Sequence, residues 1–329
     1  MIRPIGCTDS RPDDMIINRE PSPINMRDLI NQGNARVMMI LAMSIFGTIG
    51  FITYHIDLPS SIIVVFRGTI GASFMLVLIY AMGSRLSKDD IFSNMFTLVC
   101  SGICLGLNWL FLFEAYKTIA ISEATVLNYL TPALTILATP IFLRQKVPFF
   151  KLGCALTALL GLIMVSGIIE NGMDVDMYGI TCGVLAAVFY TAMILFNKKL
   201  KSIGSYDRTF VQLLVASVLV IAYSAFTVDV SSLSFDGFTI GLLVMLGILQ
   251  TAIAFTLYFG SLAYLDAPDA AILGYIEPIL GVMLSILFLH EDLGPIGWIG
   301  AAIIIGSTFI PELVDRFKAK SNDIGDGQT

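Results

Sequence analysis

Charged residues are scarce in this chain, and this scarcity excludes an ordinary soluble fold. They make up 13% of the 329 residues, against about 25% in a typical soluble domain. Hydrophobic residues make up 56%, against roughly 45–50%. The chain therefore has too little polar sequence to cover a soluble surface, and its composition indicates an all-α integral membrane protein.

Histidine and paired cysteines are nearly absent as well. The only histidines, His55 and His290, fall at the expected ends of apolar segments, so no histidine proton relay can form inside the membrane. No CxxC pair occurs among the five cysteines, and without neighbouring histidines we expect them to pack as small apolar residues. The five are Cys7, Cys100, Cys104, Cys154 and Cys182. We expect no metal and no cofactor.

Motifs of familiar membrane enzymes and pumps are also missing. The sequence contains no HExxH, no GxSxG and no Walker A loop, which argues against an intramembrane hydrolase and an ATP-driven pump. We therefore expect a protein that is not an enzyme. Its expected partners are a small-molecule substrate and the lipid bilayer rather than nucleic acid.

Long apolar runs dominate what is present. Ten segments have about the 17–25 residues that a membrane-spanning helix needs, and short connections leave no room for a soluble domain. They lie at about 37–54, 61–82, 92–116, 123–143, 149–169, 177–197, 207–227, 238–262, 269–289 and 295–312. The polar arm at 1–36 has no signal-peptide core and is predicted to be disordered, and residues 313–329 form a tail.

The basic residues predict the orientation. With ten spans and a cytoplasmic N-terminus, every one of the 19 lysines and arginines except Arg67 and Lys117 falls on the cytoplasmic side. Because cytoplasmic loops of membrane proteins carry an excess of lysine and arginine, we expect both termini to be cytoplasmic, in a multi-pass protein of the plasma membrane.

An internal repeat relates the two halves. Shifting the chain by 146 positions aligns 113–143 with 259–289 without a gap, and the Tyr-x-x-Pro of Tyr129 and Pro132 falls on Tyr275 and Pro278. Five spans lie in each half, at 37–170 and 171–312, so the second half must enter the membrane inverted. Inverted repeats are a recurrent architecture of secondary transporters.

The chain resembles the drug/metabolite transporter superfamily, with two EamA-type domains of five helices each. The resemblance covers about 37–312 and is carried by Arg67 in VVFRGTIGASF, by Asn108-Trp109, by the run from Ala115 into Pro132, by Tyr275-Ile276-Glu277-Pro278 and by Phe288-Leu289-His290-Glu291. The family often closes the fourth helix with an acid, where this chain has Gln145. The resemblance implies alternating access in a pocket lined by the third, fourth, eighth and ninth spans.

The expected activity is secondary active transport, in the direction of export, of small organic metabolites or amphipathic compounds such as amino acids by alternating access, with proton coupling as one option. A sugar-phosphate or nucleotide-sugar exchanger is the alternative within the superfamily, but phosphate groups need several cations and Arg67 is the one basic residue inside a span. From a different class, an intramembrane enzyme or a receptor-like structural protein remains open. The last span could also form a contact in a homodimer.

The two prolines mark a candidate centre. Pro132 and Pro278 each remove a helical hydrogen bond, which frees the carbonyl groups of Asn128 and Gly274. In hydrocarbon such groups must face protein, water or substrate. Each proline lies roughly 12–15 Å from the start of its helix at about 1.5 Å per residue, so we expect both near the membrane midplane. Kinks that serve only helix packing are the alternative.

Glu277 is the strongest candidate for function. A carboxyl group facing lipid would cost about 2.5–3.5 kcal/mol, so we expect it to face inward. There it could bind a proton or a cation as the site alternates between sides. A fixed structural hydrogen bond to a neighbouring helix is the other interpretation.

Two further groups of residues are candidates. Arg67, about six residues or ~10 Å inside its helix, is expected to form a charge clamp with Glu114 near the same helix end, or else to contact a substrate carboxylate. Polar and aromatic residues near mid-depth complete the predicted substrate site, although aromatic side chains also gather in interfacial belts. They are Asn108, Trp109, Asn128, Tyr129, Thr131, Gln250 and Tyr275, together with Glu277.

Overall fold

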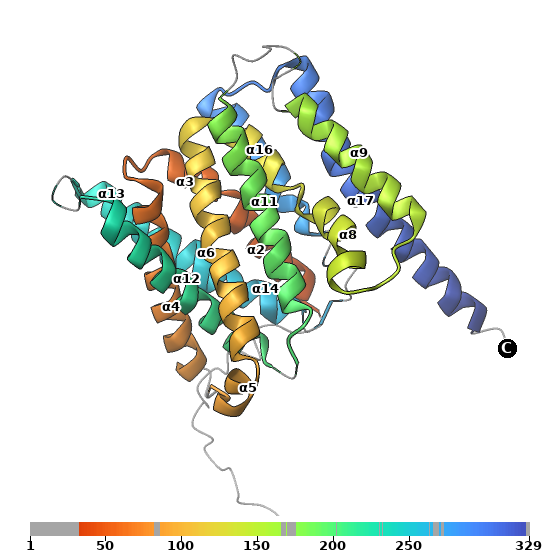
Figure 1. Cartoon of the computed structure of the whole chain (residues 1–329), viewed down its shortest axis with the longest axis horizontal. Coiled ribbons are helices and arrows are strands. Elements are labelled where there is room, and N and C mark those ends of the chain that lie inside the picture. The colour runs from red at the N-terminus through yellow and green to blue at the C-terminus, as the bar shows by residue number, and fades with distance from the viewer. Residues whose placement is uncertain are drawn as a thin grey trace, which may run out of the picture.

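The described part of the chain is entirely helical. The computed structural model describes residues 33–326 except 82–85, 166–168, 170–175, 202, 230, 232, 263, 266–269 and 271–272. These residues form helices and no strand (Figure 1). Residues 1–32 of the arm that we predicted to be disordered lie outside the described residues.

Apolar helices account for most of the fold. Eight helical stretches are long and apolar enough to cross a membrane, and two shorter apolar helices, α9 and α16, accompany them. The chain is therefore a multi-pass membrane protein. In order, the helices are α2 (Ala35–Gly47), α3 (Ile49–Tyr54), α4 (Ser60–Ala81), α5 (Lys88–Ser93), α6 (Met95–Thr118), α7 (Ile121–Asn128), α8 (Thr131–Phe142), α9 (Phe149–Val165), α11 (Met177–Asn197), α12 (Ser205–Thr227), α13 (Gly237–Gly247), η2 (Ile248–Ile253), α14 (Ala254–Leu262), α16 (Ile276–Leu289) and α17 (Gly294–Asp326).

Three of the expected spans are interrupted near their middles. The first breaks at Thr48, whose hydroxyl group donates to the Ile45 carbonyl at 2.7 Å. The fourth breaks between α7 and α8 rather than bending, and Pro132 lies in the first turn of α8, where a missing N–H costs nothing. The eighth contains the π-helical segment η2 between α13 and α14. Such irregular backbone is common at functional sites.

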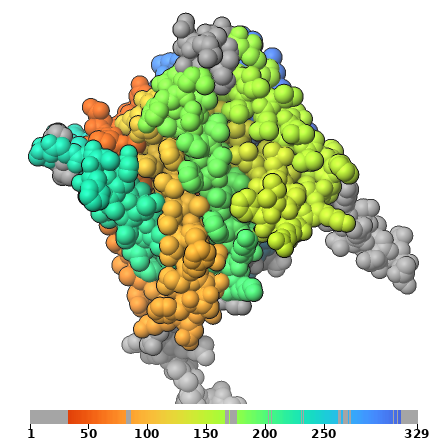
Figure 2. Space-filling view, in the orientation of Figure 1, coloured from red at the N-terminus to blue at the C-terminus, as the bar shows by residue number. Residues whose placement is uncertain are grey.

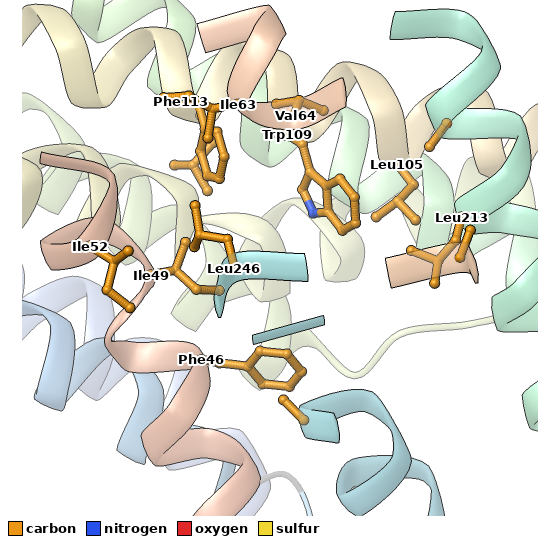
Figure 3. Close-up of a cluster of buried hydrophobic side chains, with 14 of the residues drawn as sticks. Phe46, Ile49, Ile52, Ile63, Val64, Leu105, Trp109, Phe113, Leu213 and Leu246 are labelled. Atoms are coloured by element: carbon orange, nitrogen blue, oxygen red, sulfur yellow. The ribbon is translucent and has the colours of Figure 1, made fainter. Parts of the chain in front are cut away.

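Long-range packing pairs helices from the two halves. α6 contacts α11 and α12, whereas α2 contacts α14 and α16, and α4 contacts both α12 and α13. The largest hydrophobic cluster lies where these helices meet. Figure 3 shows Trp109 and Phe113 of α6 in this cluster, with Phe46 of α2 and Leu246 of α13 nearby.

The ends of the bundle are tied by polar contacts. At the end that carries α5, the Asn94 side chain donates to the Lys201 carbonyl at 2.8 Å and accepts from its N–H at 3.0 Å. There the Asp207 carboxylate also accepts from the Ser87 N–H at 3.3 Å. At the opposite end, Lys117 donates to the Ile56 carbonyl. We call the first end of the bundle the α5 end. We call the opposite end the Glu291 end, because Glu291 lies there.

α9 and α17 form a close pair at one side of the bundle (Figure 1). In the space-filling view α9 lies at the outer surface, and α11 lies between α6 and α8 (Figure 2). Glycines allow the backbones of α9 and α17 to approach. A β-carbon added at Gly300 would lie 2.8 Å from the Gly161 carbonyl oxygen and 2.6 Å from Cβ of Met164. Small residues at such contacts stabilise membrane helices through close van der Waals packing.

Substituting this glycine should weaken the pair. We expect Gly300→Val to lower the free energy of unfolding by about 1–3 kcal/mol, the usual cost of overpacking a tight contact. Gly306→Val is the matched control in the same helix, because a β-carbon there meets nothing within 4 Å. Thermal unfolding of the detergent-solubilised protein measures both. Equal stability of the two variants would contradict this packing.

Candidate functional site

The three interrupted helices meet at one place. Gln250 of η2 donates to the hydroxyl group of Thr48, at the α2–α3 break, across 3.2 Å. A β-carbon added at Gly47 would lie 2.8 Å from the Glu277 carbonyl oxygen, so α2 packs tightly against the start of α16. The Tyr129 hydroxyl group, at the α7–α8 break, lies within hydrogen-bonding reach of the Glu277 carboxylate. Irregular backbone therefore gathers around Glu277, where membrane transporters typically place their binding sites.

Arg67 and Glu277 lie together at this meeting place. We call it the centre, and it comprises the α2–α3 break, the α7–α8 break, η2 and the start of α16. Arg67 of α4 is 2% exposed, and its guanidinium carbon lies 4.2 Å from the centroid of the Trp109 ring. Its Nε donates to the Thr251 hydroxyl group at 3.1 Å, and among the described residues no acceptor pairs with its two terminal Nη groups. Arg67 and Glu277 lie close enough to interact electrostatically. The centre therefore presents N–H donors and a carboxylate together.

Tyrosines surround Glu277. The hydroxyl groups of Tyr116, Tyr129, Tyr190 and Tyr258 all lie within electrostatic range of its carboxylate. Tyr190 of α11 is nevertheless 37% exposed. Its side chain is therefore partly accessible and also close to the interior charges. Aromatic faces and hydroxyl groups in such a place suit an organic ligand.

The structure does not bring Arg67 and Glu114 together, so the expected charge clamp is absent between these two described residues. Arg67 contacts Trp109 and Phe113, whereas Glu114 accepts a hydrogen bond from the Tyr178 hydroxyl group at 3.3 Å. Positions 109 and 113 share one face of α6, and position 114 is turned by about 100° from position 113 at 3.6 residues per turn. Glu114 therefore faces α11 instead of α4.

Three of the predicted substrate residues form a polar network between helices. Asn108 is 3% exposed and donates to the Ala186 carbonyl at 2.9 Å and to the Asn128 side chain at 3.2 Å. The Thr131 hydroxyl group donates to the Asn128 carbonyl at 2.7 Å. The carbonyl that Pro132 leaves without a helical partner is thus satisfied inside the bundle. This network fixes the α7–α8 break against α11.

Of the remaining predicted substrate residues, some lie at the centre, whereas Tyr275 packs against a neighbouring helix. Trp109 lies beneath the Arg67 guanidinium at the centre. Gln250 is also there, fully buried, and no group in the described part of the chain hydrogen-bonds to its Oε1. Tyr275, by contrast, packs edge to face against Phe309 of α17 at 5.0 Å between ring centroids. The two tyrosines of the repeat therefore have different surroundings, because Tyr129 lies at Glu277.

The sequence analysis did not identify several residues that lie at the centre. Thr48 and Thr251 hold the α2–α3 break and the Arg67 side chain, respectively. Tyr116 contacts the Thr125 hydroxyl group at 3.4 Å and lies near Glu277. A threonine in an apolar run is common and gives no signal of its own. Among the described residues no cluster of three or more His, Cys, Asp or Glu side chains could hold a metal ion.

Glu291 caps the start of α7 from the loop after α16. Its carboxylate oxygens accept from the N–H groups of Ile121 at 2.9 Å and Ser122 at 3.0 Å, and from the Ser122 hydroxyl group at 2.9 Å. A carboxylate at a helix N-terminus satisfies free donors and opposes the positive end of the helix dipole. The contact joins the second half of the chain to the first at the Glu291 end.

Removal of this charge should loosen α7. We expect Glu291→Gln to lower the free energy of unfolding by about 1 kcal/mol and to speed hydrogen exchange in a peptide that contains Ile121 and Ser122. Asp89→Asn serves as the control, because Asp89 is an exposed acid in the first turn of α5 at the other end. Unchanged exchange at the start of α7 would show that Glu291 does not hold this helix.

Comparison with known proteins identifies the relatives of this chain. The model of the EamA-like transporter family matches residues 34–167 and again residues 177–311. An uncharacterised transporter of Bacillus subtilis strain 168, YxxF, is 29% identical over 275 residues, which cover 80% of this chain and 86% of that protein. The pseudopaline exporter CntI of Pseudomonas aeruginosa is 26% identical over 165 residues, covering 50% of this chain and 56% of the exporter.

A solved crystal structure has a fold similar to that of this chain. It has a TM-score of 0.62 and 19% sequence identity, and the similarity covers 86% of this chain and 99% of that one. The two family matches together span most of the apolar helices, and the relatives are named as transporters. The chain therefore belongs to the EamA-like transporter family and is a membrane transporter of the drug/metabolite type.

Proposed function

We propose that this protein exports small organic metabolites or amphipathic compounds, such as amino acids, by alternating access, with Glu277 as the proton-coupling residue. The observation that carries the proposal is the position of Glu277. It lies where three interrupted helices meet, beside Arg67 and within reach of Tyr129. An ionisable residue at such a place in a membrane protein is a candidate for the transport site.

Two inverted five-helix repeats, at 37–170 and 171–312, form the proposed framework. The packing supports this symmetry. If α2 corresponds to α11, and α6 corresponds to α13 with α14, then the contact of α6 with α11 becomes the contact of α14 with α2. In the same way the contact of α8 with α11 becomes that of α16 with α2. Two equivalent halves give a carrier two similar end states.

The chemistry of the centre favours a zwitterion with an apolar body. The free Nη groups of Arg67 suit a carboxylate, because a guanidinium binds carboxylates through paired hydrogen bonds. The Glu277 carboxylate suits an ammonium group. Trp109, Tyr129 and Tyr190 offer aromatic faces for the remainder. The relative CntI, named as a pseudopaline exporter, supports export of an organic metabolite.

The proposed orientation places the α5 end in the cytoplasm of the cell, with both termini there and the protein in the plasma membrane. Lys88, Lys198, Lys199, Lys201 and Arg208 lie at or near this end, in agreement with the excess of basic residues in cytoplasmic loops. The Glu291 end would then be external. Its capping contact at α7 supports a state in which the external side is closed.

Transport assays test the proposal. Purified protein in liposomes, with a pH gradient of either sign, is supplied with a panel of radiolabelled amino acids, and uptake is compared with protein-free liposomes. We expect at least one amino acid to accumulate against its gradient, with a rate that depends on the direction of the pH gradient. Equal flux with and without the protein across the whole panel would contradict the proposed substrate class.

A further inference from the structure

A second cation faces the interior at the α5 end. Arg208 lies in the first turn of α12, and its guanidinium carbon lies 5.4 Å from the centroid of the Phe259 ring in α14. Its Nε is buried, and among the residues that the structure describes it has no hydrogen-bond partner. Among the described residues Arg208 forms no ion pair, and the neighbouring Asp207 carboxylate accepts from the Ser87 N–H instead.

The contact with the Phe259 ring does not satisfy the N–H donors of the Arg208 side chain. A cation–π contact uses the flat face of a guanidinium, whereas its five N–H donors lie in the plane of the group. A buried donor without an acceptor is costly, and more so when it carries charge. Burial of Nε without a partner therefore indicates a place for an acceptor.

The surroundings of Arg208 are aromatic. Phe259 is stacked with Phe255 at 5.8 Å and lies edge to face with Tyr258 at 5.0 Å. Phe255 in turn lies 5.1 Å from Phe46 of α2. A positive charge at one end of a run of four aromatic rings complements an anion that carries an apolar body. We call Arg208, Phe46, Phe255, Tyr258 and Phe259 the α5-end site.

The α5-end site leads toward the centre. The Tyr258 hydroxyl group lies within electrostatic range of both Arg208 and Glu277. Phe46 and Tyr258 contact each other at 6.4 Å between ring centroids. One aromatic residue thus borders both the cation at the α5 end and the acid at the centre.

We propose that Arg208 and the aromatic residues beside it bind an organic anion, a carboxylate attached to an apolar body, at the α5 end before it reaches Glu277. The role in transport rests on the proposed function, whereas binding of the anion does not. Two sources share this chemistry, namely a soluble metabolite and the headgroup of an anionic lipid. The proposal names the soluble metabolite.

Benzoate, an aromatic carboxylate, and benzamide, its neutral counterpart, test the binding directly. Thermal unfolding of the detergent-solubilised protein is followed during titration with each compound, since a ligand of the folded state raises the unfolding temperature. We expect benzoate but not benzamide to stabilise the protein. Arg208→Gln should weaken the apparent affinity for benzoate about tenfold, which corresponds to about 1.4 kcal/mol, and Arg208→Lys should weaken it less.

Two further variants locate the anion. Lys199→Gln removes an exposed charge at the same end and should leave the affinity for benzoate unchanged. If Arg67→Gln abolishes the benzoate effect and Arg208→Gln does not, the anion binds at the centre and the proposal is wrong. Absence of any difference between benzoate and benzamide would also overturn it. Because no transport is measured, failure here is distinct from failure of the proposed function.

A second titration, in lipid nanodiscs, distinguishes a soluble metabolite from a lipid headgroup as the bound anion. The same titration is repeated in nanodiscs of phosphatidylcholine with and without phosphatidylglycerol. We expect benzoate to stabilise the protein equally in both. If phosphatidylglycerol alone stabilises the wild type, does not stabilise Arg208→Gln, and removes the benzoate effect, the occupant is a lipid headgroup and the proposal of a soluble anion is overturned.

Discussion

Replacement of Glu277 by glutamine is expected to reduce strongly the accumulation of substrate driven by a pH gradient. Glutamine has nearly the same shape and can still hydrogen-bond to the Tyr129 hydroxyl group, which lies within reach of residue 277. Unlike a carboxylate, however, its amide cannot bind and release a proton. Coupling free energies between two binding events are about 1–3 kcal/mol, so accumulation should fall by about 5- to 150-fold. Initial rates in proteoliposomes at several pH values measure this effect.

The same assay contains its control. Glu114→Gln changes an acid that bonds Tyr178 near the Glu291 end, and we expect its pH dependence to equal that of the wild type. Downhill exchange of substrate should survive in Glu277→Gln, because the variant loses coupling rather than the binding site. Accumulation by Glu277→Gln that still follows the pH gradient would remove this residue from the coupling mechanism.

Replacement of Arg67 by glutamine is expected to cause the largest loss of stability. The variant loses a cation–π contact with Trp109, worth about 0.5–2 kcal/mol. It also loses a charged hydrogen bond to Thr251, worth about 1.5–3 kcal/mol. We therefore expect the free energy of unfolding to fall by about 2–5 kcal/mol. Unfolding in mixed detergent micelles measures this change, and Lys146→Gln, at an exposed position, is the control.

A double-mutant cycle tests whether Arg67 and Glu277 act together. Removal of the arginine leaves Glu277 without its nearby cation, so adding Glu277→Gln should recover part of the lost stability. The interaction free energy for such neighbours is about 0.5–3 kcal/mol. Strict additivity of the two single variants would show that the two side chains do not influence each other in the folded protein.

The sequence predicted the helices well because hydrophobic length determines them. Each of the apolar segments contains or overlaps an apolar helix of the structure. The breaks were harder to find. Pro132 indicated an interruption of the fourth span, since proline removes a backbone donor. The break at Thr48 and the π-helical turn η2 have no such residue, and they depend on contacts between distant helices, such as Gln250 with Thr48.

Residues of the centre could be chosen from the sequence where the cost of a charge in lipid applies. Glu277 was expected to face inward because a charge in lipid is expensive, whereas Arg67 was expected to pair with Glu114 or with a substrate carboxylate. In the structure Arg67 is buried and lies close enough to Glu277 to interact electrostatically. Partners were less predictable. Glu114 was chosen for its depth, but the direction around the axis of α6 decides which helix it faces, and that direction depends on packing. Asn108 was chosen for its polarity and is used between helices.

The central claim is that the space beside Glu277 opens to each side of the membrane in turn. Tyr190→Cys, in a chain whose five native cysteines are replaced, reports on this space, because Tyr190 is 37% exposed and lies near Glu277. A membrane-impermeant maleimide is added to one side of oriented proteoliposomes, then to the other. We predict labelling from either side, with the balance shifted by the pH gradient. Labelling from neither side, or from one side under every condition, would contradict alternating access at this site.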